Sequence, residues 1–169
     1  MTLRLVLIRH AKSSWDDFSI EDHDRHLNER GRRSAPAIGQ WIADTSDIPT
    51  EVLCSDAKRT KETLDLMMEQ WPTTPAVRYV HSLYLAPATT MLAELKTAKA
   101  PIVAMIGHNP GIGSFACGLV HDRPDHPKYA SYPTCATAII DFDVAQWSDV
   151  TAASGRVVAF TTPRELLNE

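Results

Sequence analysis

Two arginines and two histidines in this sequence each follow an apolar stretch that has the length of a β-strand. Arg9 and His10 follow the run LRLVLI, Arg59 lies in SDAKRTKET after the run EVLC, and His108 lies in GHNPG after the run IVAMI. A cluster of cations at the end of a buried strand is unfavourable unless a negative group binds there. The pattern therefore predicts a site for an anion.

The chemistry of these residues favours a phosphoryl group as that anion. Guanidinium groups bind phosphoryl oxygens through paired hydrogen bonds. A helix that begins after Gly111 would direct its first amides at the same anion, and Gly107 and Gly111 would allow the backbone to turn tightly around His108. If the three strand ends are neighbours in one sheet, the sequence predicts a phosphate site at that edge.

Apolar stretches of strand length alternate, over most of the chain, with segments of helical spacing. Strands are expected over residues 3–8, 51–54, 77–80, 102–106, 136–142 and 156–160. Apolar residues recur every three to four positions, as on one face of a helix, in segments 35–42, 60–68 and 91–95. The alternation predicts an α/β fold, a three-layer α/β/α sandwich with a mostly parallel central sheet. Because no helix separates the last two strands, that edge of the sheet is predicted to be antiparallel.

Long loops are expected over two segments. Residues 11–27 are dense in acidic residues and are expected to form a loop over the end of the first strand. Asn28 could cap the helix that follows, which would place Pro36 inside it. A start near Ser34, with Pro36 in the first turn, is the alternative. Residues 121–133 contain three prolines and are expected to form the second loop.

The composition is typical of one globular domain. The chain has 169 residues, 44% hydrophobic and 22% charged, and residues 1–169 are expected to form a single domain. The formal net charge of −4 argues against nucleic acid or a membrane as the partner. Cys54, Cys117 and Cys135 are scattered, which favours a reducing compartment. Since neither a membrane span nor a signal-peptide pattern is present, a cytoplasmic location is predicted.

No cofactor and no metal site is predicted. The segment HDRPDH, residues 121–126, lacks the paired spacings of metal ligands, and residues 16–26 lack the glycine and terminal glutamate of an EF-hand. Neither GxGxxG nor the Walker pattern of a nucleotide-binding loop occurs.

Taken in order, the motifs RHAKSSW, SDAKRTKET and GHNPG resemble those of the histidine phosphatase superfamily, which has the phosphoglycerate mutase-like fold. The resemblance is closest to its small SixA-like branch, the phosphohistidine phosphatases. It covers nearly the whole chain, including RHLNERG at residues 25–31 and YPTCATAIIDFD at residues 132–143. Each motif is weak alone, whereas three in sequence at strand ends are specific.

The resemblance implies roles for the two arginines and two histidines at the strand ends. His10 would be the nucleophile that carries the phosphoryl group as a covalent phosphohistidine, and Arg9, Arg59 and His108 would bind the equatorial oxygens. An imidazole nucleophile has to be neutral, and nearby cations lower the pKa of a histidine. A bound phosphate would act in the opposite direction, so His108 is expected to be protonated when substrate is present.

Further residues are candidates for binding substrate or phosphate: Lys12, Ser13, Arg25 and Asn109. Lys12 and Arg25 either extend the positive rim or pair with local aspartates, and Ser13 either donates to phosphate or shapes the turn. Thr134 is expected to border the pocket. Trp15 and Tyr84 are interpreted as packing residues.

One position departs from the family pattern. Many members carry an acidic residue just before a pair like Leu83-Tyr84, where it protonates the leaving group, whereas this chain has His81 and Ser82 there. Losing that acid would slow the release of an alkoxide by about 10²–10⁴-fold. An imidazole leaving group needs no such residue, since water can supply its proton. His81, Asp16 or Asp22 as a substitute acid remains the alternative.

These observations predict a metal-independent phosphatase that removes the phosphoryl group from phosphohistidine on a protein and releases inorganic phosphate. No large insertion is available to roof the pocket, which favours a site open to a protein loop. One alternative is a phosphatase for a small phosphoester or pyrophosphate. The other is a phosphate-recognition module without turnover, although such a module has no need of a nucleophile behind the phosphorus.

Overall fold

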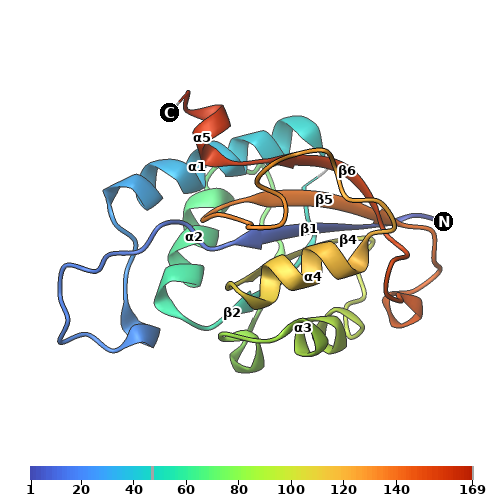
Figure 1. The fold of residues 1–169 in the computed structure, drawn as a ribbon, viewed down its shortest axis with the longest axis horizontal. Coiled ribbons are helices and arrows are strands. Elements are labelled where there is room, and N and C mark those ends of the chain that lie inside the picture. The colour runs from blue at the N-terminus through green and yellow to red at the C-terminus, as the bar shows by residue number, and fades with distance from the viewer. Residues whose placement is uncertain (47, 169) are drawn as a thin grey trace.

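A six-stranded sheet forms the centre of the computed structural model, which describes residues 1–46 and 48–168 (Figure 1). Its strands are β1 (Leu3–Arg9), β2 (Glu51–Ser55), β3 (Ala76–Val80), β4 (Ile102–Gly107), β5 (Thr137–Phe142) and β6 (Arg156–Thr161). They lie in the order β3-β2-β4-β1-β5-β6. β1 to β4 are parallel, β5 is antiparallel to β1, and β6 is antiparallel to β5. The predicted parallel sheet with an antiparallel edge is therefore confirmed.

Helices cover both faces of this sheet, as Figure 1 shows. α1 (Glu29–Thr45), α2 (Lys58–Met68) and the short α5 (Pro163–Leu166) lie on one face. α3 (Ala88–Leu95) and α4 (Gly111–Leu119) pack together on the other. The three-layer α/β/α sandwich is confirmed. Within the described ranges, no helix has both the length and the apolar character needed to cross a bilayer.

The alternation of side chains along β1 decides which helices cover which face. Leu5 and Leu7 belong to the apolar cluster that includes Ile112 of α4. Val6 and Ile8, which point the opposite way, belong to the cluster that includes Ile38 of α1. Successive residues of a strand face opposite sides, so both faces of a central strand must be apolar. Burying each of these side chains stabilises the fold by about 1.5–3 kcal/mol.

Helix α1 begins at the earlier of the two predicted positions. The Oδ1 atom of Asn28 accepts a hydrogen bond of 2.9 Å from the Gly31 amide, so Asn28 caps the helix and Pro36 lies inside it. The alternative start near Ser34 is wrong. Gly31 also explains the start, because a Cβ atom there would lie 2.2 Å from the Lys12 carbonyl oxygen. The close contact of helix and loop requires glycine at this position.

Both predicted loops are present. The loop after β1 contains one short 3-10 helix, Asp22–Asp24, and its two ends are joined by a bridge between Ser13 and Leu27. The loop after α4 is anchored by Tyr132, whose hydroxyl donates a hydrogen bond of 2.6 Å to the Leu7 carbonyl oxygen. Because the first of these loops directly follows β1, it lies at the carboxyl end of the parallel strands, where ligands of such sheets bind.

Alanine substitutions at two helix glycines are expected to have opposite effects on stability, because one glycine is closely packed and the other is not. A Cβ atom on Gly39 would lie 2.8 Å from Cα of Met67, whereas one on Gly118 would meet nothing within 4 Å. We expect Gly39→Ala to lower the free energy of unfolding by about 1–3 kcal/mol, because α1 and α2 must separate. Gly118→Ala, on an exposed helix position, should raise it by about 0.5–1 kcal/mol. Urea unfolding of both variants measures this, and equal effects would contradict the packing described here.

Candidate active site

The carboxyl ends of β1, β2 and β4 bring the predicted residues together. Arg9 lies opposite Gly107 in the parallel register, and Cys54 lies opposite Ile106. One pocket at this edge is lined by Arg9, His10, Lys12, Ser13, Trp15, Asp22, Arg25, Arg59, Leu85, His108, Asn109 and Thr134. All four residues with predicted catalytic roles, and all four predicted to bind substrate, therefore line the same pocket.

His10 is held in one tautomer with one ring nitrogen free. Its side chain is buried, and Nδ1 lies 2.7 Å from the carbonyl oxygen of Ala11. Because a carbonyl oxygen can only accept, Nδ1 carries the proton and Nε2 keeps its lone pair. The next peptide is fixed as well, since the Ala11 amide donates to Thr63 Oγ1 at 2.9 Å. The free nitrogen of His10 is thus positioned by the backbone on both sides.

The surroundings of His10 keep its ring neutral. Burial lowers its pKa well below the ordinary value, the hydrogen bond to Ala11 raises it in part, and the positive charges of Arg59 and Arg9 lower it further. Burial disfavours the charged form of an imidazole, and neighbouring cations do the same. At neutral pH, His10 therefore presents an unprotonated Nε2.

His108 lies against His10, with the two ring centroids 5.2 Å apart. Its Nε2 atom lies 2.7 Å from Ser55 Oγ, at the end of β2. Burial first, and then the charge of Arg59, lower the pKa of His108 to about 3. α4 begins just beyond it at Gly111, as predicted, where a Cβ atom would lie 1.8 Å from the Ala86 carbonyl oxygen.

Arg59 holds the acidic loop against the pocket through Asp22. Its guanidinium donates to the Asp22 carbonyl oxygen at 2.6 Å and to Oδ2 at 3.0 Å. Tyr84 donates its hydroxyl proton to the same carboxylate, and Arg25 Nε donates to Oδ1 at 3.1 Å. Burial raises the pKa of Asp22, but the hydrogen bonds from Tyr84 and Arg59 outweigh it and hold the pKa well below its usual range. Asp22 is therefore a carboxylate at neutral pH and a poor proton donor.

Three buried side-chain nitrogens have no hydrogen-bond partner among the described residues: Arg9 Nε, Arg59 Nε and His108 Nδ1. All three belong to residues that line this pocket. A buried donor without a partner costs about 1–3 kcal/mol, and more when it is charged. An anion with several oxygens in the pocket would remove these costs together.

Lys12, Ser13, Arg25 and Asn109 all line the pocket, and the last three also make side-chain hydrogen bonds within the protein. Arg25 donates to Ser13 Oγ at 2.5 Å, and the Trp15 ring lies over its guanidinium, 3.5 Å from centroid to Cζ. Asn109 uses its amide group to donate to the Ser131 carbonyl oxygen and to accept from the Gly113 amide. These residues therefore shape the pocket wall.

Two of the three candidate acids lie elsewhere. Asp16 and His81 are not among the lining residues, and the His81 side chain is 76% exposed. His81 and His23 both hydrogen-bond to Asp56, each at 2.8 Å. Their ligand atoms lie within 4.8 Å of one another, which is close enough to hold a metal ion. Hydrogen bonding to the shared carboxylate is sufficient to explain this closeness.

Sequence reasoning missed three residues that position the site. Ser55 orients His108, Thr63 fixes the peptide after His10, and Tyr84 holds Asp22 while its ring meets His108 edge-on at 5.4 Å. Ser55 directly follows an apolar run, which is a usable signal for a strand-end residue. Tyr84 was interpreted as packing, and only the fold brings it to Asp22.

Comparison with families and curated proteins gives relatives over most of the chain. Residues 5–79 match the model of the "Histidine phosphatase superfamily (branch 1)". An uncharacterized protein of Mycobacterium leprae is 31% identical over 166 residues, covering 93% of this chain and 100% of that protein. An uncharacterized chloroplastic protein of Arabidopsis thaliana is 31% identical over 163 residues, covering 90% of this chain and 72% of that protein.

Solved structures share the fold over nearly the full length. The structure of a candidate phosphohistidine phosphatase SixA from Nakamurella multipartitia has a TM-score of 0.82 and 27% identity, and the match covers 96% of this chain and 97% of that one. A protein histidine phosphatase SixA complexed with tungstate has a TM-score of 0.75 and 18% identity, covering 97% and 99% of the two chains. At 18% identity, this second match shows only that the two chains share a fold.

Proposed function

Because the chain belongs to the histidine phosphatase superfamily, we propose that it is a metal-independent phosphatase with His10 as nucleophile. The predicted superfamily, the SixA-like fold and the enzyme class, a phosphatase with a histidine nucleophile, are confirmed. The roles of individual residues are our proposal. Arg9, Arg59 and His108 bind the equatorial oxygens of the phosphoryl group, and His10 attacks the phosphorus in line.

The observation that carries this proposal is the set of three unpartnered nitrogens beside the free Nε2 of His10. Arg9 Nε, Arg59 Nε and His108 Nδ1 are buried and have no partner among the described residues, and the residues that carry them line one pocket with His10. Phosphoryl transfer requires mainly positioning and charge stabilisation. Side chains supply both here, so the proposal needs no metal ion.

The proposed reaction has two steps, transfer of the phosphoryl group to His10 and its hydrolysis. The lone pair on Nε2 of His10 forms a bond to phosphorus, the bond from phosphorus to the substrate nitrogen breaks, and the leaving imidazole takes a proton from water. The oxygen of a second water then attacks phosphorus, the bond from phosphorus to Nε2 breaks, and the electron pair returns to neutral His10. The phosphate formed gives one proton to the hydroxide left by the first step. The two arginines stabilise the charge on the equatorial oxygens throughout.

The proton donors available in the pocket favour phosphohistidine as the substrate. Of the lining residues described, Asp22 alone is acidic, and its low pKa keeps it ionised. Ser82, at the position where an acid was expected, donates its hydroxyl to Glu94 at 2.9 Å. An alkoxide leaving group would find no acid here, whereas a protonated imidazole needs none. We therefore propose phosphohistidine on a protein as the substrate.

The acid limb of kcat/KM should report the neutral form of His10. Burial and the neighbouring cations lower its pKa below 6.5, so we expect kcat/KM to fall only as the pH drops below that value. The measurement is phosphate release between about pH 4 and pH 8, with spontaneous hydrolysis of the substrate subtracted. An acid limb at or above pH 6.5 would count against a neutral nucleophile.

Two substrates of different leaving group test the proposed function directly. We expect phosphate release from a histidine-phosphorylated carrier protein, in EDTA, to exceed release from an alkyl phosphate by at least about 10²-fold. A better rate with the alkyl phosphate would reveal a hidden acid and favour a small phosphoester as substrate. Tight binding of phosphate without turnover of either compound would instead indicate a recognition module.

We further propose that residues 1–169 act as one domain, because the described strands all join one sheet. The cytoplasmic location stays a prediction from the sequence. Neither nucleic acid nor a membrane enters the proposal.

A further inference from the structure

Two histidines and one aspartate from three separate segments meet near the active-site pocket. Nε2 of His23 lies 2.8 Å from Oδ1 of Asp56, and Nδ1 of His81 lies 2.8 Å from Oδ2 of the same carboxylate. The atoms that these side chains would offer to a metal ion lie within 4.8 Å of one another, and no other group of three among the described residues meets this condition. We call these residues the His23–Asp56–His81 cluster.

The fold brings the three members of the cluster together by different routes. β2 pairs with β3 in parallel, and Asp56 and His81 each directly follow one of these strands. His23 belongs to the loop after β1, whose 3-10 helix is held by the hydrogen bond from Arg59 to Asp22. The cluster residues are 33 and 25 positions apart in the chain, which is why their spacing in the sequence did not indicate a metal site.

The donor atoms of the cluster suit zinc. Two imidazole nitrogens and one carboxylate oxygen bind zinc at about 2.0–2.2 Å and leave a fourth position for water. Magnesium and calcium prefer oxygen ligands instead. Ligand atoms around tetrahedral zinc lie about 3.4 Å apart, so the observed separations of 2.8 Å would widen by only about 0.6 Å. The hydrogen bonds to Asp56 thus hold the three groups close to the required geometry, and a zinc ion would take the place of the shared protons.

A metal ion in the cluster would connect two parts of the fold. Figure 1 shows the loop after β1, in blue, projecting beyond the layers of the sandwich. This loop supplies Trp15, Asp22 and Arg25 to the wall of the active-site pocket. His23 belongs to the loop, whereas the other two ligands follow strands of the sheet, so one ion would link the loop to the sheet. No member of the cluster lines the pocket itself, and the proposed reaction therefore involves no metal ion.

We propose that the His23–Asp56–His81 cluster binds a zinc ion, which fixes the loop after β1 against the ends of β2 and β3. This inference goes beyond the proposed function and does not depend on it. An ion that binds only the arrangement in which all three ligands meet stabilises that arrangement. Zinc would therefore make one wall of the active-site pocket more rigid.

Zinc affinity tests the ligand set. The protein, without an affinity tag, is titrated with zinc in competition with a chromophoric chelator, and we expect a single zinc ion per chain. His23→Ala and His81→Ala should each weaken binding by at least about tenfold, because loss of even an outer-shell partner costs about 10–100-fold in metal affinity. His121→Ala is the matched control, since that histidine is half-exposed and pairs with Asp122 alone. No zinc binding, or equal affinity in all three variants, would overturn the assignment.

Hydrogen exchange tests the link between the loop and the sheet. With zinc at 100 times its Kd, backbone amides of residues 13–27 should exchange at least about tenfold more slowly in the unmodified protein and in His121→Ala. In His81→Ala the zinc effect should disappear, although position 81 lies outside the loop and its side chain is 76% exposed. Magnesium should have no effect on exchange in any of these proteins. Zinc that binds the cluster but leaves exchange in residues 13–27 unchanged would overturn the proposed link.

Discussion

Replacement of His10 by alanine is expected to lower phosphate release from a histidine-phosphorylated carrier protein by at least about 10⁴-fold. The variant loses the Nε2 atom, which stays unprotonated because Nδ1 donates to the Ala11 carbonyl oxygen, in the pocket lined by Arg9 and Arg59. His108 cannot take its place without a rearrangement, because its Nε2 lies 2.7 Å from Ser55 Oγ and its Nδ1 is buried. Steady-state phosphate release in EDTA measures the loss.

Covalent labelling identifies the nucleophile independently of the rate. A brief reaction with radiolabelled substrate, stopped in alkali, should leave label on the unmodified protein and none on His10→Ala. His121→Ala is the matched control, because that histidine is half-exposed, pairs with Asp122 and lies outside the pocket. Label retained by His10→Ala would contradict the assignment and make His108, 5.2 Å away, the next residue to test.

The sequence could predict those site residues that directly follow an apolar run of strand length. An apolar run marks where a strand lies, and the residue after the run marks its end, so Arg9, His10 and His108 could be placed at one edge of the sheet. Arg59 followed from the same logic, because α2 begins at Lys58 just after β2 and Arg59 is its second residue. The alternation of strand-length apolar runs with segments of helical spacing likewise predicted helices on both faces of the sheet.

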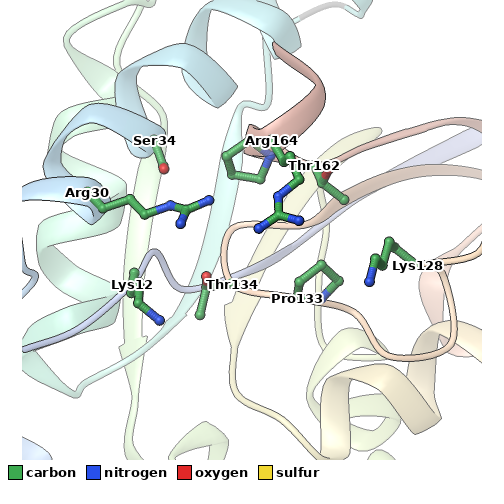
Figure 2. A pocket seen from close by; sticks show the side chains of 9 residues that line it. Lys12, Arg30, Ser34, Lys128, Pro133, Thr134, Thr162 and Arg164 are labelled. Carbon is green, nitrogen blue, oxygen red and sulfur yellow. The ribbon is translucent and has the colours of Figure 1, made fainter. Parts of the chain in front are cut away.

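Loop contacts between distant residues could not be predicted. The Tyr84–Asp22 hydrogen bond joins residues 62 positions apart, and neither belongs to a periodic segment. The start of α1 was ambiguous for a related reason. Asn28 and Ser34 both suit a helix start, and the outcome depends on the close contact between Gly31 and Lys12 of another segment. Likewise, the pocket lined by Lys12, Lys128 and Arg164 draws its residues from separate segments, and no local pattern places them together (Figure 2).

Arg59→Lys is expected to lower kcat/KM for the phosphoprotein by about 10²–10³-fold. Lysine keeps the charge but has one ammonium group in place of a planar fork, so it cannot bind two oxygens as a pair. The buried Nε atom of Arg59, which has no partner among the described residues, would also be lost as a donor. Arg9, Arg59 and His108 form the proposed clamp around the phosphoryl oxygens. Since this clamp binds the transition state more strongly than the ground state, kcat should fall more than KM rises. Steady-state kinetics on the carrier protein separate the two, with Arg33→Lys as the conservative control at an exposed site.

Asp22→Asn distinguishes two roles of Arg59, binding of the phosphoryl group and anchoring of the acidic loop after β1. Arg59 also anchors Asp22, with bonds of 2.6 Å and 3.0 Å, so Arg59→Lys could act by releasing the acidic loop. Asp22→Asn weakens that anchor and leaves the guanidinium of Arg59 in place. If the clamp is what matters, Asp22→Asn should lower kcat/KM by less than about tenfold. A loss as large as that of Arg59→Lys would mean that Arg59 acts through the loop and would remove it from the residues that bind the phosphoryl group.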